Sequence, residues 1–171
     1  MPRHLVLVGL PGSGKSTVGK AVAELLGADL IDIDSLLVRE MGMPVVQIFG
    51  MVGEPRFREM ERAAVKTAQA REPCVIVPGG GWAAQPGEID SARNTSLIIY
   101  LECQPSTALK RSGQGESRPL LTGADPQQRI RALLQEREPF YLQAHHRVRA
   151  EGTIEAIAGE IVELSRRHAG W

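Results

Sequence analysis

The sequence predicts an α/β fold of the doubly wound class, built on a five-stranded parallel sheet. Apolar runs at 5–8, 30–33, 75–77 and 97–101 alternate with segments of helical pattern, and 147–150 is a candidate fifth strand. Strands that are apolar throughout are typical of a parallel sheet covered by helices on both faces. Ligands of such folds bind beyond the carboxyl ends of the strands. We therefore expect the functional residues directly after the strands.

Composition favours one globular domain, 1–171, without a highly charged partner. Lys plus Arg and Asp plus Glu number 20 each, so we expect no nucleic acid partner. No apolar run reaches the ~18 residues of a membrane span, and the chain starts with a strand rather than a signal peptide. Cys74 and Cys103 lie in apolar runs without metal-ligand spacing, which is typical of small buried side chains. A cytoplasmic protein without a membrane partner is expected.

The first predicted strand leads directly into a phosphate-binding loop. Residues 9–16 read GLPGSGKS, match the P-loop pattern and open a helix that continues to about Leu26. Backbone N–H groups of such a loop and the helix N-terminus surround phosphate oxygens. Lys15 is expected on the β and γ phosphates of ATP and Ser16 on Mg²⁺, and a glycine-rich turn without nucleotide is the alternative. The predicted nucleotide-binding residues here are Gly12, Ser13, Gly14, Lys15, Ser16 and Thr17.

Two carboxylates follow the second predicted strand, which ends in IDID at residues 31–34. Period-two geometry places Asp32 and Asp34 on the same side, in the cleft with the P-loop. The third strand is followed by no acid, so Asp32 is expected to bind Mg²⁺ through water. Asp34 is expected to hold or deprotonate the acceptor hydroxyl. The alternative for Asp34 is a helix N-cap for the segment from Ser35 onward.

Two arginines lie on predicted helices. In the helical pattern of 54–71, Arg58 and Glu61 are neighbours at the margin of the apolar stripe, so Glu61 is placed to orient Arg58. In 126–141 the apolar stripe continues into Arg137. Spacing alone leaves a solvated or structurally paired role open for both arginines.

Glycines mark two further segments. Gly79, Gly80 and Gly81 follow the third strand, where the absence of side chains lets a ligand approach the backbone, although a flexible turn is an equal alternative. The segment 112–125 is polar, contains three glycines and is too long for an ordinary connection. We expect it to be a lid, with plain disorder as the alternative.

Taken together, these residues resemble the shikimate kinases nearly from end to end. The P-loop alone identifies a superfamily, whereas the remaining set in this order and spacing is far more specific. In chain order, the residues that carry the resemblance are GLPGSGKST at 9–17, Asp32-Ile33-Asp34, Ile48-Phe49, Gly53-Glu54, Phe57-Arg58 with Glu61, Gly79-Gly80-Gly81, Arg118-Pro119-Leu120-Leu121, and Arg137 with Tyr141.

The resemblance implies a P-loop kinase with a mobile lid, usually monomeric, that uses ATP and Mg²⁺ in aromatic amino acid biosynthesis. It implies transfer of phosphate to the 3-hydroxyl of shikimate, with Lys15, Asp34 and Arg118 as catalytic residues. Arg118 is implied to reach the phosphates from the lid, and Arg111 to lie beside adenine. The implied shikimate-binding residues are Asp34, Arg58, Gly79, Gly80, Gly81 and Arg137.

Other functions stay open at this stage. Pro78 and Trp82 flank the triple glycine where the family has smaller or more polar residues, which favours another small hydroxy acid such as gluconate as the alternative acceptor. A non-catalytic nucleotide-binding module would have no use for Asp34 and Arg137. A nucleoside monophosphate kinase should show a base-binding segment that the sequence lacks.

Overall fold

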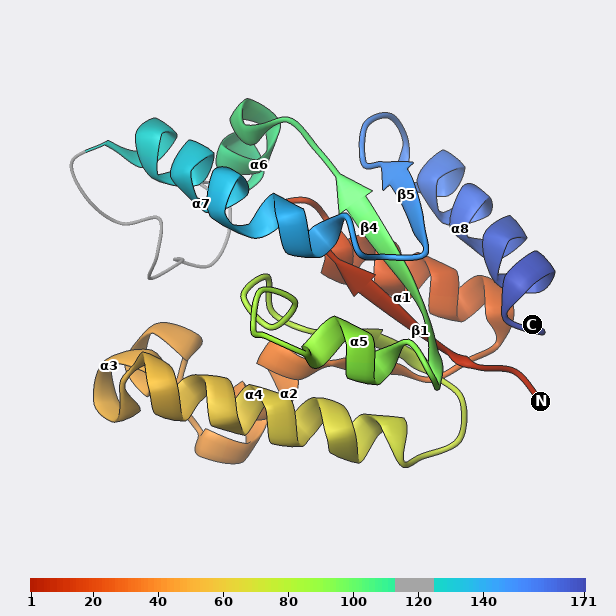
Figure 1. The fold of residues 1–171 in the computed structure, drawn as a ribbon, viewed down its shortest axis with the longest axis horizontal. Coiled ribbons are helices and arrows are strands. Elements are labelled where there is room, and N and C mark those ends of the chain that lie inside the picture. Colours follow the sequence, from red (N-terminus) through yellow and green to blue (C-terminus); the bar gives the residue numbers. More distant parts are fainter. Residues whose placement is uncertain (113–124) are drawn as a thin grey trace.

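The computed structural model contains a five-stranded sheet with the strand order β2-β3-β1-β4-β5 (Figure 1). It describes residues 1–112 and 125–171. Neighbouring strands pair in parallel throughout, which confirms the predicted fold class and the fifth strand. The strands are β1 His4–Val8, β2 Leu30–Asp32, β3 Val75–Val77, β4 Ser96–Glu102 and β5 His146–Arg149.

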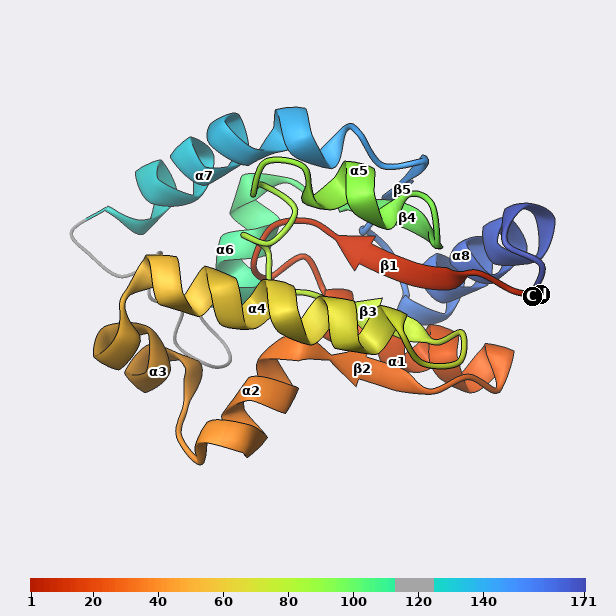
Figure 2. The same cartoon turned by 60° about the horizontal axis from the view of Figure 1, so that its bottom comes forward.

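Helices cover both faces of the sheet. Helices α1 and α8 pack against each other on one face, and α4, α5 and α7 lie on the other (Figure 2). Because of this double cover, every residue of β1 is buried. The helices are α1 Lys15–Leu26, α2 Ile33–Met41, α3 Val45–Val52, α4 Glu54–Gln69, α5 Glu88–Ala92, α6 Pro105–Ser112, α7 Pro126–Tyr141 and α8 Ile154–His168.

The order of the strands fixes where a ligand can bind. From the central β1 the chain crosses to β2 at one edge, returns to β3, and then passes β1 to reach β4 on the other side. The crevice of a doubly wound sheet opens where the connections change direction, here at the carboxyl ends of β1 and β3. The P-loop follows β1 and the triple glycine follows β3, so the two segments meet at this crevice.

One predicted strand is shorter than expected. Strand β2 ends at Asp32, and Ile33 already begins α2. Asp32 is the N-cap of that helix, because its side chain accepts a hydrogen bond from the Ser35 backbone N–H at 3.1 Å. The period-two argument for Asp32 and Asp34 was therefore wrong, and so was the alternative of Asp34 as the cap.

Most of the predicted lid, residues 113–124, lies outside the described residues. Its two flanks are described: Ser112 is the last residue of α6, and Asp125 caps α7 by accepting from the Gln128 N–H at 3.1 Å. Among the described residues no single helix is long and apolar enough to span a membrane; α2 and α3 together pass the same criteria but are bent by 71°. Cys74 and Cys103 are buried, as predicted.

A histidine side chain pairs with β4 just before β5. The backbone N–H of His145 donates to the Ile98 carbonyl at 2.9 Å, and its ring Nδ1 accepts from the Ile98 N–H at 3.0 Å. A nitrogen that accepts a hydrogen bond carries no proton. Burial, followed by the nearby charges of Arg93, Arg3 and His146, lowers the pKa of His145.

We predict that acid weakens the fold through His145. Because its pKa is lowered in the folded state, the unfolded chain binds the proton more tightly, and stability is lost as pH falls below about 6.5. The free energy of unfolding, measured by denaturant titration, should fall between about pH 7.5 and about pH 5.5. In His145→Asn the amide oxygen accepts the same bond without titrating, so the fall should be smaller. An unchanged pH dependence in His145→Asn would contradict this.

Candidate functional site

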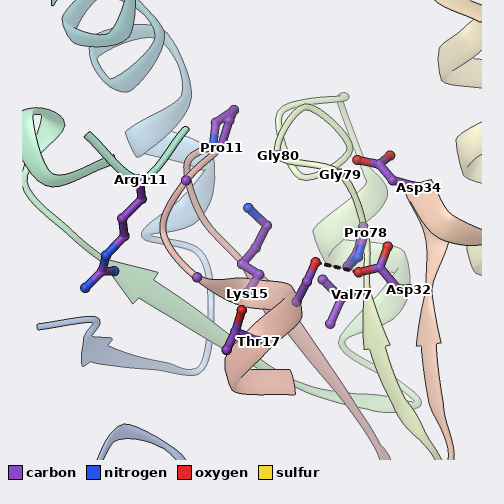
Figure 3. Close-up of a pocket in the computed structure, with 13 residues that line it drawn as sticks. Pro11, Lys15, Thr17, Asp32, Asp34, Val77, Pro78, Gly79, Gly80 and Arg111 are labelled. Carbon is purple, nitrogen blue, oxygen red and sulfur yellow. Dashed lines mark hydrogen bonds between the residues drawn. The ribbon is translucent and has the colours of Figure 1, made fainter. Parts of the chain in front are cut away.

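A cavity of about 260 Å³ opens at the carboxyl ends of the central strands (Figure 3). It brings together the P-loop, the two aspartates at the end of β2 and the start of α2, and the segment after β3, which the sequence predicted separately. In Figure 3 Lys15 lies in the middle of the view, between Arg111 on one side and Asp32 on the other. The lining residues are Pro11, Gly12, Gly14, Lys15, Ser16, Thr17, Asp32, Asp34, Val77, Pro78, Gly79, Gly80 and Arg111.

The P-loop needs its glycines for its conformation. Gly12 and Gly14 have φ angles of 81° and 93°, in the left-handed region that favours glycine. A Cβ on Gly12 would also lie 2.2 Å from the Ala108 carbonyl oxygen, so the loop packs directly on α6. Ser13 is fully buried, and its hydroxyl has no hydrogen-bond partner among the described residues.

The Lys15 ammonium is held inside this loop. Its Nζ donates to the carbonyl oxygens of Gly9 at 2.9 Å and Leu10 at 2.8 Å. The side chain is buried, so water screens the positive charge at the wall of the cavity less than it would screen an exposed ammonium. Lys15 lines the cavity in which the P-loop pattern predicts the phosphates.

Asp32 and Ser16 form a pair of oxygen ligands at the edge of the cavity. The Ser16 hydroxyl donates to Asp32 Oδ2 at 2.5 Å, and the other carboxylate oxygen is fixed by the α2 cap. Mg²⁺ prefers oxygen ligands, takes few carboxylates and keeps several waters, so this pair fits it. Within 1–112 and 125–171, no group of three or more His, Cys, Asp or Glu side chains could hold a metal ion.

A buried ion pair packs against the triple glycine, next to the cavity. Arg58 donates to Glu61 Oε1 at 3.0 Å, and both side chains are almost fully buried on α4. The Arg58 guanidinium also lies over the rings of Phe49 and Phe57, at 6.0 and 5.5 Å from their centroids. Glu61 therefore orients Arg58, as its spacing predicted. Both side chains are more deeply buried than a place at the margin of the apolar stripe suggested.

Burial changes the protonation of Glu61. Burial raises its pKa to about 7, with Asp34 adding to the rise, while the positive charges of Arg58 and Arg137 oppose it. Its second oxygen, Oε2, has no hydrogen-bond partner among the described residues. Glu61 is therefore only partly ionised near neutral pH.

The triple glycine is packed against the charged side chains of the site. A Cβ on Gly79 would lie 2.4 Å from Glu61 Oε2 and 3.2 Å from Asp34 Oδ1, and one on Gly81 would lie 2.4 Å from Arg58 Cζ. We expected small residues here for the approach of a ligand. The structure gives a further reason, because side chains at these positions would displace the acids and the arginine.

Helix α7 adds a second arginine and a tyrosine to the side chains packed against the triple glycine. Arg137 is 5% exposed and points inward with the apolar stripe, as predicted, and a Cβ on Gly80 would lie 3.2 Å from its guanidinium. Tyr141 donates its hydroxyl proton to the Gly80 carbonyl at 2.7 Å. Sequence reasoning missed this contact, although the spacing of four residues from Arg137 places Tyr141 on the same helix face.

Trp82 does not reshape the cavity in the way its position suggested. Its side chain is 1% exposed and belongs to the hydrophobic core. Pro78, by contrast, does line the cavity. Pro11 was not singled out from the sequence, but it lines the cavity and lies close to Gly80.

Arg111 lies on the nucleotide side. It donates to the carbonyl oxygens of Ser13 at 3.2 Å and Ala150 at 3.0 Å, and so joins the P-loop to the segment after β5. The predicted catalytic Arg118 lies outside the described residues. All other predicted site residues are described; except for Ser13, they line the cavity or belong to the cluster of charged side chains around the triple glycine.

Known proteins share this sequence pattern and fold. Residues 11–166 match the model of the family "Shikimate kinase". A shikimate kinase of Caldanaerobacter subterraneus is 42% identical, with 94% of each chain covered. A solved structure of a shikimate kinase from Acinetobacter baumannii in complex with shikimate has a TM-score of 0.92 at 31% identity, covering 98% of this chain and 94% of that one.

A gluconokinase structure from Sinorhizobium meliloti, with a TM-score of 0.69 at 21% identity, covers 99% of this chain and 94% of its own. At that identity the likeness concerns the fold alone. The family model and the 42% identical relative go further, because they extend over nearly the whole chain. A P-loop beside a cluster of buried arginines and acids, in a sequence matched at this level, means that the chain belongs to the shikimate kinase family.

Proposed function

We propose that the protein transfers the γ-phosphate of ATP to the 3-hydroxyl of shikimate, giving shikimate 3-phosphate and ADP. The observation that carries this proposal is the convergence of Arg58, Arg137 and Asp34 around the triple glycine, directly beside the P-loop. Two guanidinium groups packed against one glycine loop, next to the cavity, suit a carboxylated acceptor. The Acinetobacter baumannii relative was solved in complex with shikimate.

The nucleotide side provides positive charge and backbone donors. Lys15 neutralises charge on the β and γ phosphates, and the N–H groups of the P-loop hold their oxygens. Ser16 and Asp32 would hold Mg²⁺, which supplies further charge neutralisation between the phosphates when bound. Arg111 lies at the far side of the loop, where it would contact the base.

The acceptor side positions the nucleophile. Arg58 and Arg137 bind the acceptor carboxylate, which fixes the ring and directs one hydroxyl toward the P-loop. Asp34 accepts the proton of that hydroxyl as its oxygen bonds to the γ-phosphorus, and the bond to the bridging oxygen of ADP breaks. The role of Arg118 stays a prediction from the family.

The reaction can be tested with an assay that couples ADP release to a spectroscopic signal. Shikimate, gluconate, AMP, CMP and UMP would be compared as acceptors with Mg²⁺ and ATP. The proposal requires turnover that depends on shikimate and greatly exceeds turnover with the other acceptors. Preference for gluconate would support the alternative acceptor, and ATP binding without turnover would support a non-catalytic module.

Removing the charge of Lys15 should stop the reaction. In Lys15→Ala the backbone cradle survives, but the ammonium that meets the β and γ phosphates is lost, so kcat should fall by about 10²-fold or more. Lys20→Ala is the matched control, because Lys20 is exposed on the same helix. Near-normal kcat in Lys15→Ala would remove the P-loop lysine from the mechanism.

Asp34→Asn should lower kcat by about 10²-fold, because an amide of the same size cannot accept the hydroxyl proton. Steady-state kinetics with saturating shikimate would measure this. Asp90→Asn, at an exposed acid on α5, makes the same chemical change away from the cavity and should keep full activity. The base role is excluded if Asp34→Asn retains the wild-type kcat and loses only stability.

Gly81→Ala should weaken acceptor binding through Arg58. The added Cβ would lie 2.4 Å from the guanidinium carbon and would push Arg58 out of place, so the KM for shikimate should rise about tenfold or more. Gly159→Ala is the control, because a Cβ there meets nothing within 4 Å. The KM for ATP should change little in both variants. An equal rise of the KM for shikimate and the KM for ATP in Gly81→Ala would mean that the whole site, rather than Arg58 alone, is disturbed.

A further inference from the structure

The backbone of the triple glycine is fixed by three separate donors. The Gly79 carbonyl accepts from the Trp82 N–H at 3.1 Å, and the Gly81 carbonyl accepts from the Gln85 side-chain amide at 3.2 Å. Between them, the Gly80 carbonyl accepts from the Tyr141 hydroxyl at 2.7 Å. The first two donors lie on the same loop, whereas Tyr141 is at the end of α7.

A fixed carbonyl also fixes the amide that follows it. In a trans peptide unit the C=O and N–H groups point in opposite directions, and the chain has no cis peptide bond among its described residues. The Tyr141 hydroxyl therefore orients the peptide between Gly80 and Gly81, and directs the Gly81 N–H away from α7. It also determines the position of Gly81, which lies against the Arg58 guanidinium.

Arg137 lies beside the same glycine. A Cβ on Gly80 would lie 3.2 Å from the Arg137 guanidinium, and Arg137 precedes Tyr141 by four residues on α7. Burial raises the pKa of Tyr141 to about 12, and the nearby positive charge of Arg137 opposes this rise. The hydroxyl therefore keeps its proton at neutral pH and donates it to the Gly80 carbonyl, next to a second predicted acceptor-binding residue. The Tyr141 side chain is 0% exposed, so this geometry is enclosed in the core.

We propose that Tyr141 is a positioning residue for the acceptor: it ties α7, the helix that carries Arg137, to the triple glycine and thereby sets the position of Arg137 relative to Arg58. This inference rests on the proposed function for the identity of the acceptor. Without the hydroxyl, the Gly80 carbonyl loses its donor. The glycine loop, against which both arginines pack, is then no longer held to α7 by this bond. ATP binding uses the P-loop and does not depend on this contact.

The chain contains a matched control for this hydroxyl. Tyr100 on β4 stacks on Tyr141, with ring centroids 5.2 Å apart, and is 1% exposed. Its hydroxyl donates to Glu138 Oε2 at 2.9 Å rather than to the glycine loop. Replacing either tyrosine with phenylalanine removes one buried hydroxyl from the same aromatic pair, so both variants should lose stability by similar amounts.

The experiment compares Tyr141→Phe, Tyr100→Phe and the wild-type chain. We expect the KM for shikimate to rise roughly tenfold in Tyr141→Phe and to stay near the wild-type value in Tyr100→Phe, with the KM for ATP unchanged in both. Hydrogen exchange gives a readout without turnover: amides of 79–82 should exchange faster in Tyr141→Phe than in Tyr100→Phe.

Equal KM values for the acceptor in the two variants, or equal exchange in the glycine loop, would overturn the inference. A parallel loss of ATP and acceptor binding in Tyr141→Phe would overturn it too, because it would show general damage. Failure of the proposed function is a separate result, visible as wild-type protein that does not phosphorylate shikimate. In that case the KM values of the two variants would be compared for the acceptor that the ADP-release assay identifies. The hydrogen-exchange measurement needs no acceptor.

Discussion

The acceptor side of the site depends on the burial of Arg58 and Glu61. A buried charge is costly unless it is paired, and the contact of 3.0 Å between these two side chains meets that need on a single turn of α4. The pair leaves no room for a Cβ on Gly79 or Gly81. The ion pair therefore requires glycine at these two positions, in addition to any requirement of the ligand. Losing Glu61 would leave the Arg58 charge without its closest partner in the core, and losing Arg58 would favour the protonated form of Glu61.

The sheet explains why groups far apart in the sequence share one cavity. Parallel strands present their carboxyl ends at one edge, so the segments after β1, β2 and β3 meet there in the order set by the strand pairing. Arg137 and Tyr141 reach the same place by a different route, because α7 lies across the face of the sheet (Figure 2). The nucleotide side is thus built mainly on loop and strand ends, and the acceptor side on two helices that face each other across the glycine loop.

Much of this was predictable from local pattern. The P-loop, the two aspartates and the triple glycine each follow a strand directly, and apolar runs predict strands well. The sequence could not show that Asp32 is a helix cap, because IDID fits a strand as well as it fits a strand end followed by a helix. Nor could it show that Arg58 and Arg137 converge or that Tyr141 bonds to Gly80, since those distances depend on how α4 and α7 pack. Trp82 shows the opposite error: proximity in sequence suggested a role in the cavity, but its side chain points into the core.

The charges of the acceptor side suit an anionic ligand. Asp34 and Glu61 balance Arg58 and Arg137 when both acids are ionised, which leaves little net attraction for a carboxylate. The raised pKa of Glu61, about 7, changes this balance, because protonation of Glu61 leaves one positive charge in excess. Glu61 therefore lies where its protonation changes the charge that Arg58 and Arg137 present to a ligand, and its second oxygen is directed at the glycine loop.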